Sequence, residues 1–363
     1  MEQDKIFEKA YLVGVSFESA AKIKEDLAEL KRLSETADLE VVGETYQVIK
    51  EVTPATLLGK GKIEEIAEEL EKNGATVVVI DNSLSGSQMK NLSTAFGVKV
   101  IDRMGLILDI FAKRAVSYEG KIQVELAQLK YSLPHLVSLQ DSSDRFGGGV
   151  GMRGPGETKI ELNRRKIERR IQKLEKDIEE LKEQRSINRQ KRLEGTVKRV
   201  AIVGYTNVGK STLLNMITKA GIYADDKLFA TLDTTSRKLF LSPQLQVILT
   251  DTVGFINKLP HELVEAFAST LEEAAGADLI IHVVDLSNPN YKQQMEMVNK
   301  TLNDIGASEI PQIIVYNKVD KLENVNIDLQ ANEVLISAKS NKGLEQLKEK
   351  IQEILDENYL MTK

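Results

Sequence analysis

The chain has 363 residues, enough for two or three domains, and its 42% apolar and 29% charged residues are typical of a soluble globular protein. It contains no cysteine, which excludes disulfides and cysteine-ligated zinc, and its three histidines do not suggest a histidine-based metal site. No apolar run reaches the length of a membrane span and no signal-peptide pattern is present. The expected compartment is the cytoplasm, with transient peripheral contact with a membrane as an alternative.

The net charge of −6 hides a strong asymmetry. Residues 159–199 carry 15 Lys+Arg and 8 Asp+Glu, whereas the remainder carries 34 basic and 47 acidic residues. An acidic chain with a single basic stretch is a poor general nucleic-acid binder, but it can present one RNA-facing element.

Residues 1–114 alternate strand and helix patterns, which predicts a small parallel α/β domain. Strands are expected at 10–15, 41–49, 76–80 and 98–101, and helices at 18–33, 63–71 and 87–96.

Residues 115–195 contain two helical stripes of apolar residues joined by one loop, which predicts a long antiparallel helical hairpin. The first stripe is Ile122, Leu126, Leu129 and Leu133, and the second runs from Ile160 to Leu181. The charged faces are solvated surfaces on the simplest interpretation, and an RNA-binding stripe is the alternative.

The hairpin loop, expected over 134–157, holds six glycines within the ten residues 147–156. Such a composition is typical of a flexible linker. A tip bearing Arg145, Phe146, Met152 and Arg153 can instead mould to RNA, with guanidinium groups on phosphates and the ring on a base. Both interpretations stay open. The residues expected to contact RNA are Arg145, Arg153, Arg164 and Arg165.

Residues 196–363 predict a doubly wound α/β domain, with strands at 199–203, 246–250, 279–284, 312–316 and 333–337. Between the first of these strands and a helical pattern lies a complete G-x-x-x-x-G-K-S phosphate loop, from Gly204 to Ser211. Glycines let the backbone curl around phosphates, Lys210 supplies a point charge, and the Ser211 hydroxyl is a Mg²⁺ ligand. His282 lies within an apolar strand and is interpreted as structural.

Two further elements follow in the order that a GTP site requires. Asp251 begins Asp-Thr-Val-Gly at a strand end and is expected to hold Mg²⁺ through water, while the Gly254 N–H can reach the γ-phosphate. Asp320, in Asn-Lys-Val-Asp, can accept from both guanine N1–H and the N2 amine, which adenine cannot satisfy. Ser337-Ala338-Lys339 resembles a third base-side loop, with the Ala338 N–H facing the guanine oxygen.

A switch threonine is expected between the phosphate-loop helix and Asp251, where Thr231, Thr234 and Thr235 are candidates. Phe255 occupies the position where signalling GTPases often have a glutamine that orients the attacking water. A phenyl ring cannot do this, so slow turnover by the isolated chain is expected, and Phe255 can also simply pack against the switch.

The residues expected to contact GTP or GDP form a list in chain order. They are Gly204, Tyr205, Thr206, Asn207, Val208, Gly209, Lys210, Ser211, Thr212, Phe229, Ala230, Thr231, Leu232, Asp233, Asp251, Thr252, Val253, Gly254, Asn317, Lys318, Val319, Asp320, Ser337, Ala338 and Lys339. Catalysis is assigned to Lys210, Thr231 and Gly254, and Mg²⁺ to Ser211, Thr231 and Asp251.

Together these motifs make the chain resemble the HflX family of ribosome-associated GTPases. The resemblance rests on residues 58–62, 121–131, 147–157 with Arg164-Arg165, 229–233 and 251–255, and so covers nearly the whole chain. The family's switch threonine matches Thr231. One departure is Thr234, where the family usually has proline.

The resemblance implies a P-loop GTPase (G) domain and a GTP hydrolase that is stimulated by the ribosome. It also implies binding to rRNA of the large (50S) subunit and dissociation of stalled or idle 70S ribosomes under stress; a monomer is expected. The alternative is an RNA-binding assembly or hibernation factor for which GTP is a structural ligand. A signalling GTPase without RNA is a third reading, which the basic hairpin disfavours.

Overall fold

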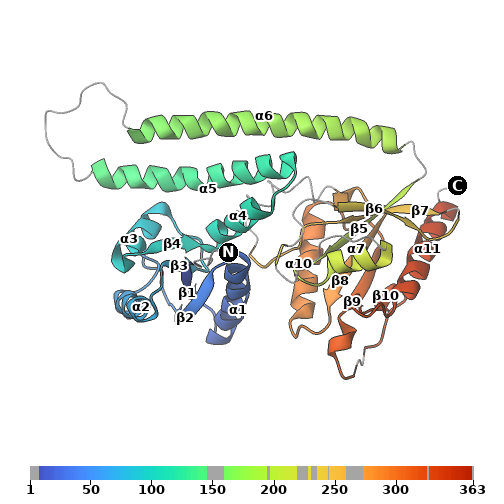
Figure 1. The fold of residues 1–363 in the computed structure, drawn as a ribbon, viewed down its shortest axis with the longest axis horizontal. Helices are drawn as coiled ribbons and strands as arrows, with labels where there is room; N and C mark the ends of the chain where they lie inside the picture. The colour runs from blue at the N-terminus through green and yellow to red at the C-terminus, as the bar shows by residue number, and fades with distance from the viewer. Residues whose placement is uncertain are drawn as a thin grey trace, which may run out of the picture. The chain divides into compact units, whose positions relative to one another are not determined.

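The computed structural model describes residues 8–144, 159–193, 197–218, 228–229, 235–243, 245–258, 273–324 and 327–361. They form two compact units (Figure 1). Unit 1 comprises residues 1–113 and 121–178, and unit 2 comprises residues 114–120 and 179–363. Among the described residues, no helix is both long and apolar enough to cross a membrane.

Unit 1 contains a four-stranded parallel sheet in the order β2-β1-β3-β4. Its elements are β1 (Lys9–Ser16), α1 (Ala20–Thr36), β2 (Glu40–Val48), α2 (Lys60–Asn73), β3 (Val77–Ile80), α3 (Gly86–Phe96), β4 (Lys99–Asp102) and α4 (Arg103–Arg114). The inner strands β1 and β3 are buried along nearly their whole length, which is why they appear as continuous apolar runs. The predicted parallel α/β domain is confirmed.

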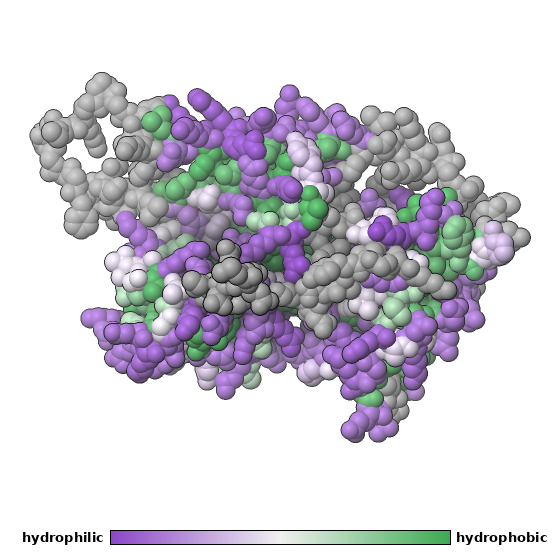
Figure 2. Space-filling view, in the orientation of Figure 1, coloured by the Kyte–Doolittle hydropathy of each residue, from purple (hydrophilic) through white to green (hydrophobic). Residues whose placement is uncertain are grey.

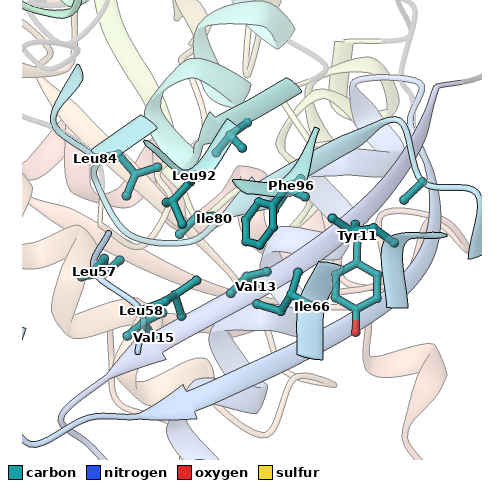
Figure 3. Packing of buried hydrophobic residues seen from close by; sticks show 14 of the residues in the cluster. Tyr11, Val13, Val15, Leu57, Leu58, Ile66, Ile80, Leu84, Leu92 and Phe96 are labelled. Carbon is teal, nitrogen blue, oxygen red and sulfur yellow. The ribbon is translucent and has the colours of Figure 1, made fainter. Parts of the chain in front are cut away.

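The core of unit 1 lies between this sheet and helices α2 and α3 (Figure 3). Tyr11 and Val13 of β1 contribute to the same buried cluster as Ile66 of α2 and Phe96 of α3. Helix α3 begins with a capping box, in which Ser85 and Gln88 each bond to the other's backbone N–H. Both strand and helix patterns therefore follow from the sequence in this unit.

Helix α4 was not predicted. Seven of its twelve residues are buried, from Arg103 to Phe111, so its sequence lacks the polar face by which an amphipathic helix is recognised. It also follows β4 directly, without an intervening turn signal.

The helical hairpin consists of α5 (Tyr118–Asp144) and α6 (Lys159–Leu193), which run antiparallel (Figure 1). Arg170 and Lys130 make ion pairs across it, to Glu125 at 2.6 Å and to Glu175 at 2.8 Å. Figure 2 shows hydrophilic side chains along the outer edge of α6. The hairpin prediction is confirmed.

The predicted loop start at residue 134 is wrong, because α5 continues through Pro134 to Asp144. Proline removes one helical N–H donor, but packing and side-chain contacts can offset this loss. Next to it, His135 has Nδ1 2.6 Å from the Tyr131 carbonyl oxygen and Nε2 3.2 Å from the Leu84 carbonyl oxygen. This tertiary contact fixes a turn of helix that a proline would otherwise weaken.

Unit 2 contains a six-stranded sheet in the order β10-β9-β8-β5-β7-β6. Its elements are β5 (Lys198–Gly204), α7 (Lys210–Thr218), β6 (Thr235–Phe240), β7 (Gln246–Asp251), β8 (Leu279–Asp285), α10 (Tyr291–Asp304), β9 (Gln312–Asn317), a 3₁₀ turn (Val319–Lys321), β10 (Glu333–Leu335) and α11 (Leu344–Met361). The doubly wound G-domain fold is confirmed. Only β6, an antiparallel edge strand with mostly exposed residues, was not predicted.

Candidate nucleotide site

The phosphate loop joins the end of β5 to the start of α7. Gly204 has φ +152°, and a Cβ there would lie 2.3 Å from the Val283 carbonyl oxygen. Gly209 has φ +96°, and a Cβ there would lie 2.5 Å from Asn317 Nδ2. Both positions therefore require glycine, because the conformation and the space each exclude a side chain.

Lys210, the first residue of α7, lies beneath this loop with only 6% of its surface exposed. Its Nζ donates to the carbonyl oxygens of Gly204, at 3.1 Å, and Tyr205, at 3.0 Å. Burial lowers the pKa of Lys210 to about 8, and the nearby Asp251 carboxylate opposes this shift. An anion bound at the loop would favour the charged lysine in the same way.

Asp251, at the end of β7, is the other charged group of this region. It is 1% exposed, and Ser211 Oγ donates to its Oδ2 at 2.6 Å. A hydroxyl and a carboxylate at this separation supply the hard oxygen donors that Mg²⁺ prefers, and Mg²⁺ needs few protein ligands. The residues present therefore fit a magnesium ion.

The loop after Asp251 runs along the phosphate loop. Phe255 N donates to the Gly204 carbonyl at 3.1 Å, and Thr206 N donates to the Phe255 carbonyl at 2.7 Å. A Cβ on Gly254 would lie 3.0 Å from Lys210 Nζ, so only glycine allows this approach. Thr252 is buried, and its hydroxyl donates to the Ile202 carbonyl at 2.8 Å.

The Phe255 ring is a core residue. It is 2% exposed and packs in a cluster with Val203, Ile280 and Val298. The interpretation that Phe255 packs inside the domain is therefore confirmed, and its backbone rather than its ring faces the phosphate loop.

The Asn-Lys-Val-Asp segment is tied to the phosphate loop by two side chains. Asn317 Nδ2 donates to the Val208 carbonyl at 2.8 Å, and Lys318 Nζ donates to the Asn207 carbonyl at 2.6 Å. Phosphate-side and base-side loops are thus held together by the protein's own hydrogen bonds.

Asp320 is exposed, and Ser337 Oγ donates to its Oδ1 at 2.5 Å. This hydrogen bond holds the pKa of Asp320 below its ordinary value, so the carboxylate stays ionised. The Ala338 N–H was expected to face a guanine oxygen, but it donates to Asn317 Oδ1 at 2.9 Å. The structure thus gives this amide a different partner, because the Asn317 carboxamide lies between the two loops.

Asp285 was missed by sequence reasoning. It ends β8, and its Oδ2 lies 2.7 Å from Lys318 Nζ, with both side chains less than one-fifth exposed. Ser287 donates to the other oxygen, at 2.6 Å from its hydroxyl. The available signal was a carboxylate ending an apolar strand, the same signal that identified Asp251.

Several predicted residues lie outside the described part of the chain: Ala230, Thr231, Leu232, Asp233, Arg145 and Arg153. Phe229 is described and is buried with φ 54°, an unusual value for an aromatic residue. Thr212 is half-buried, Val253 and Val319 are buried, and Lys339 is exposed. Arg164 and Arg165 are exposed on α6, where Arg164 pairs with Glu168 at 2.8 Å.

Three family models match successive parts of the chain. They are described as GTP-binding GTPase N-terminal, over residues 24–112, GTP-binding GTPase Middle Region, over 114–192, and 50S ribosome-binding GTPase, over 199–318. The chain is 52% identical over 345 residues to GTPase HflX of Caldanaerobacter subterraneus subsp. tengcongensis, covering 95% of this chain and 80% of that protein. The chain belongs to the HflX family of GTPases.

Other HflX proteins and solved structures agree. GTPase HflX of Escherichia coli strain K12 is 44% identical over 346 residues, covering 94% of this chain and 81% of that protein. A GTP-binding protein from the hyperthermophilic archaeon Sulfolobus solfataricus, solved in complex with GDP, superposes with a TM-score of 0.50 at 26% identity and covers 96% of this chain and 99% of its own. A complex of SsGBP and GDP gives a TM-score of 0.54 at 26% identity, covering 95% and 98%. This HflX-family chain is thus a GTP hydrolase that binds guanine nucleotides, as its motifs predicted.

Proposed function

We propose that this GTPase binds the 50S ribosomal subunit in its GTP-bound form, splits stalled or idle 70S ribosomes in the cytoplasm, and is released by hydrolysis. The match of residues 199–318 to a 50S ribosome-binding GTPase model supports the partner. The observation that carries the switch is the bonding of the Gly254–Phe255 segment to the phosphate loop. Because the two loops share hydrogen bonds, a phosphate bound at one alters the other.

In this proposal the loop amides and Lys210 bind the phosphates, and the Asp320 carboxylate accepts from guanine N1–H and the N2 amine. Ser211 and Thr231 hold magnesium directly and Asp251 holds it through water; the ion neutralises charge on the phosphate oxygens. Gly254 N–H donates to the γ-phosphate. The protein acts as a monomer, with Arg145, Arg153, Arg164 and Arg165 contacting rRNA.

Base selection can be tested with Asp320→Asn. Asparagine donates from Nδ2 to the xanthine C2 carbonyl but cannot accept from the guanine N2 amine, so preference should shift from GTP toward XTP by about 100-fold or more. Competition binding of GDP against XDP measures this shift. Retained guanine preference would show that Asp320 does not contact the base.

Ribosome coupling is tested by titrating the full chain with 50S subunits, 30S subunits and 70S ribosomes during GTP turnover. We expect 50S and 70S particles to raise kcat by at least about 10-fold and 30S subunits to have no effect. Unchanged turnover at every particle concentration would refute the coupling.

The assembly or hibernation alternative predicts a different order of events. Light scattering of 70S ribosomes, followed beside single-turnover cleavage, separates the two. Subunit dissociation that keeps pace with GTP binding and precedes protein release supports the proposal. Particle binding without dissociation, and cleavage much slower than binding, would favour the alternative.

A further inference from the structure

Thr206, the third residue of the phosphate loop, lies where the phosphate loop meets the segment after Asp251. Its N–H donates to the Phe255 carbonyl at 2.7 Å. Its Cγ2 and Cα lie 2.8 and 2.9 Å from the position that a Cβ on Gly254 would take, and Lys210 Nζ lies 3.0 Å from the same position. Thr206 and Lys210 therefore converge on Gly254.

The Thr206 hydroxyl has no hydrogen-bond partner among the residues that the structure describes, although the residue is only 5% exposed. A buried polar group without a partner costs about 1–3 kcal/mol. Valine has nearly the same shape and would fill this space without that cost. Packing alone therefore does not explain a hydroxyl at this position, and such groups in native proteins call for a ligand or a catalytic role.

The neighbourhood indicates which ligand. Lys210 and Gly254 are the groups to which the proposed function assigns the γ-phosphate, so the hydroxyl is next to the reacting end of GTP. The Phe255 ring, which stands where other GTPases place a water-orienting glutamine, is instead in the core and 2% exposed. A threonine hydroxyl can both donate to and accept from a water molecule, as that glutamine does.

We propose that Thr206 is a catalytic residue whose hydroxyl binds the attacking water and directs its oxygen at the γ-phosphorus. The proposal rests on the GTP site described under the proposed function. The water oxygen bonds to phosphorus while the bond from phosphorus to the β–γ bridging oxygen breaks. GDP leaves with that electron pair, and the water protons pass to the phosphate product and solvent. Thr206 is unchanged at the end.

The test compares Thr206→Val, which keeps the shape and removes the hydroxyl, with Thr206→Ser, which keeps the hydroxyl. Single-turnover GTP cleavage by the full chain is measured with and without saturating 50S subunits. We expect Thr206→Val to lower kcat by about 10- to 100-fold, and Thr206→Ser to stay within about 3-fold of the parent. Affinities for GDP and for a non-hydrolysable GTP analogue should be unchanged in both.

Thr301→Val provides the matched control. It removes the same group from α10, where the Thr301 hydroxyl donates to the Met297 carbonyl at 3.0 Å, and it should leave kcat unchanged. Parental kcat in Thr206→Val would overturn the proposal. So would a fall in analogue affinity without a fall in kcat, which would assign the hydroxyl to the phosphate, and so would equal losses of GDP affinity and kcat, which would mean a structural role.

The outcome for the GTP site itself is read separately. If the parent chain failed to bind GTP, the proposed site would be wrong whatever Thr206 did. If the parent binds and cleaves GTP, thermal unfolding of each variant shows that it is folded, and the Thr206→Ser result keeps the comparison decisive if Thr206→Val is unstable.

Discussion

At the scale of single residues, the ion pair between Asp285 and Lys318 governs how the base-side loop is held. Lys318 Nζ lies 2.7 Å from Asp285 and also donates to the Asn207 carbonyl in the phosphate loop. Lys318 adopts φ 65°, so its backbone conformation needs support from its side-chain contacts. Asp285 therefore positions a residue that joins the two halves of the site.

We expect Asp285→Ala to weaken GDP and GTP binding equally, by about 10-fold, because the partly buried Lys318 ammonium loses its partner. Turnover at saturating GTP should not change, since Asp285 is distant in function from the γ-phosphate. Titration with a fluorescent GDP analogue measures the affinity, and Asp285→Asn, which keeps an oxygen acceptor, should recover most of it. A lower kcat with normal affinity would contradict this role.

His282 gives the G domain a specific pH dependence. Burial, and secondarily the charge of Lys210, lowers the pKa of His282 to about 4 from an unfolded value of 6.5. The folded state therefore binds fewer protons than the unfolded state between these values. The contribution of His282 to stability is complete above pH 6.5 and is lost as the pH falls to about 4.

The expected loss in the free energy of unfolding is on the order of 3 kcal/mol across this window. Urea denaturation at pH 7.5, 5.5 and 4.5 measures it, with His282→Leu as the comparison because leucine cannot be protonated. The difference between the two proteins should grow as the pH falls. A difference that is constant with pH would mean that His282 does not titrate in this range.

At the scale of elements, one hydrogen bond joins α5 to the sheet of unit 1. Tyr131 OH donates to Asp102 Oδ1 at 2.7 Å, and that carboxylate also accepts from the N–H groups of Gly105 and Leu84. A Cβ on Gly105 would lie 3.0 Å from the Tyr131 oxygen, so glycine permits this contact. Burial strongly raises the pKa of Tyr131, which therefore remains a donor.

Tyr131→Phe should destabilise unit 1 by about 1–2 kcal/mol, because a buried carboxylate loses one of its donors. Chemical denaturation measures the loss, and hydrogen exchange should show faster opening of α5. The matched control is Tyr118→Phe, since Tyr118 is 69% exposed and its substitution should have little effect. Equal stability of the two variants would show that this bond does not hold α5.

At the scale of the whole molecule, charge is the relevant property. The chain is acidic, with a net charge of −6, yet its α6 presents exposed basic side chains at Arg165, Arg169 and Lys173. Their four-residue spacing puts them on one face of the helix. Binding to an rRNA surface through this face would release counterions, so affinity should fall steeply with salt.

Replacing Arg165, Arg169 and Lys173 by glutamine should lower the slope of log affinity for 50S subunits against log salt by about 2. Cosedimentation or light scattering over a range of potassium chloride concentrations measures the slope.

The control carries the same change in net charge on α1, α2 and α11, as Lys22→Gln, Lys72→Gln and Lys348→Gln, and should keep the parental slope. If both triple variants lower the slope equally, net charge rather than the α6 face is responsible.

The sequence by itself determined most of the fold and the positions of the nucleotide motifs. Buried strands such as β3 and β8 are continuous apolar runs, and Gly204 and Gly209 are required by local geometry. These features depend on residues close together in the chain, so their pattern is visible without a structure.

Only the tertiary structure decided which side chains join the loops and which elements lack a pattern of their own. Asp285 meets Lys318, and Asn317 meets Val208 more than one hundred residues away, through the packing of parallel strands. Strand β6 is stabilised by pairing with β7, and α4 by burial on nearly all sides. The Thr206 hydroxyl belongs to this class, because its lack of a partner is a property of everything folded around it.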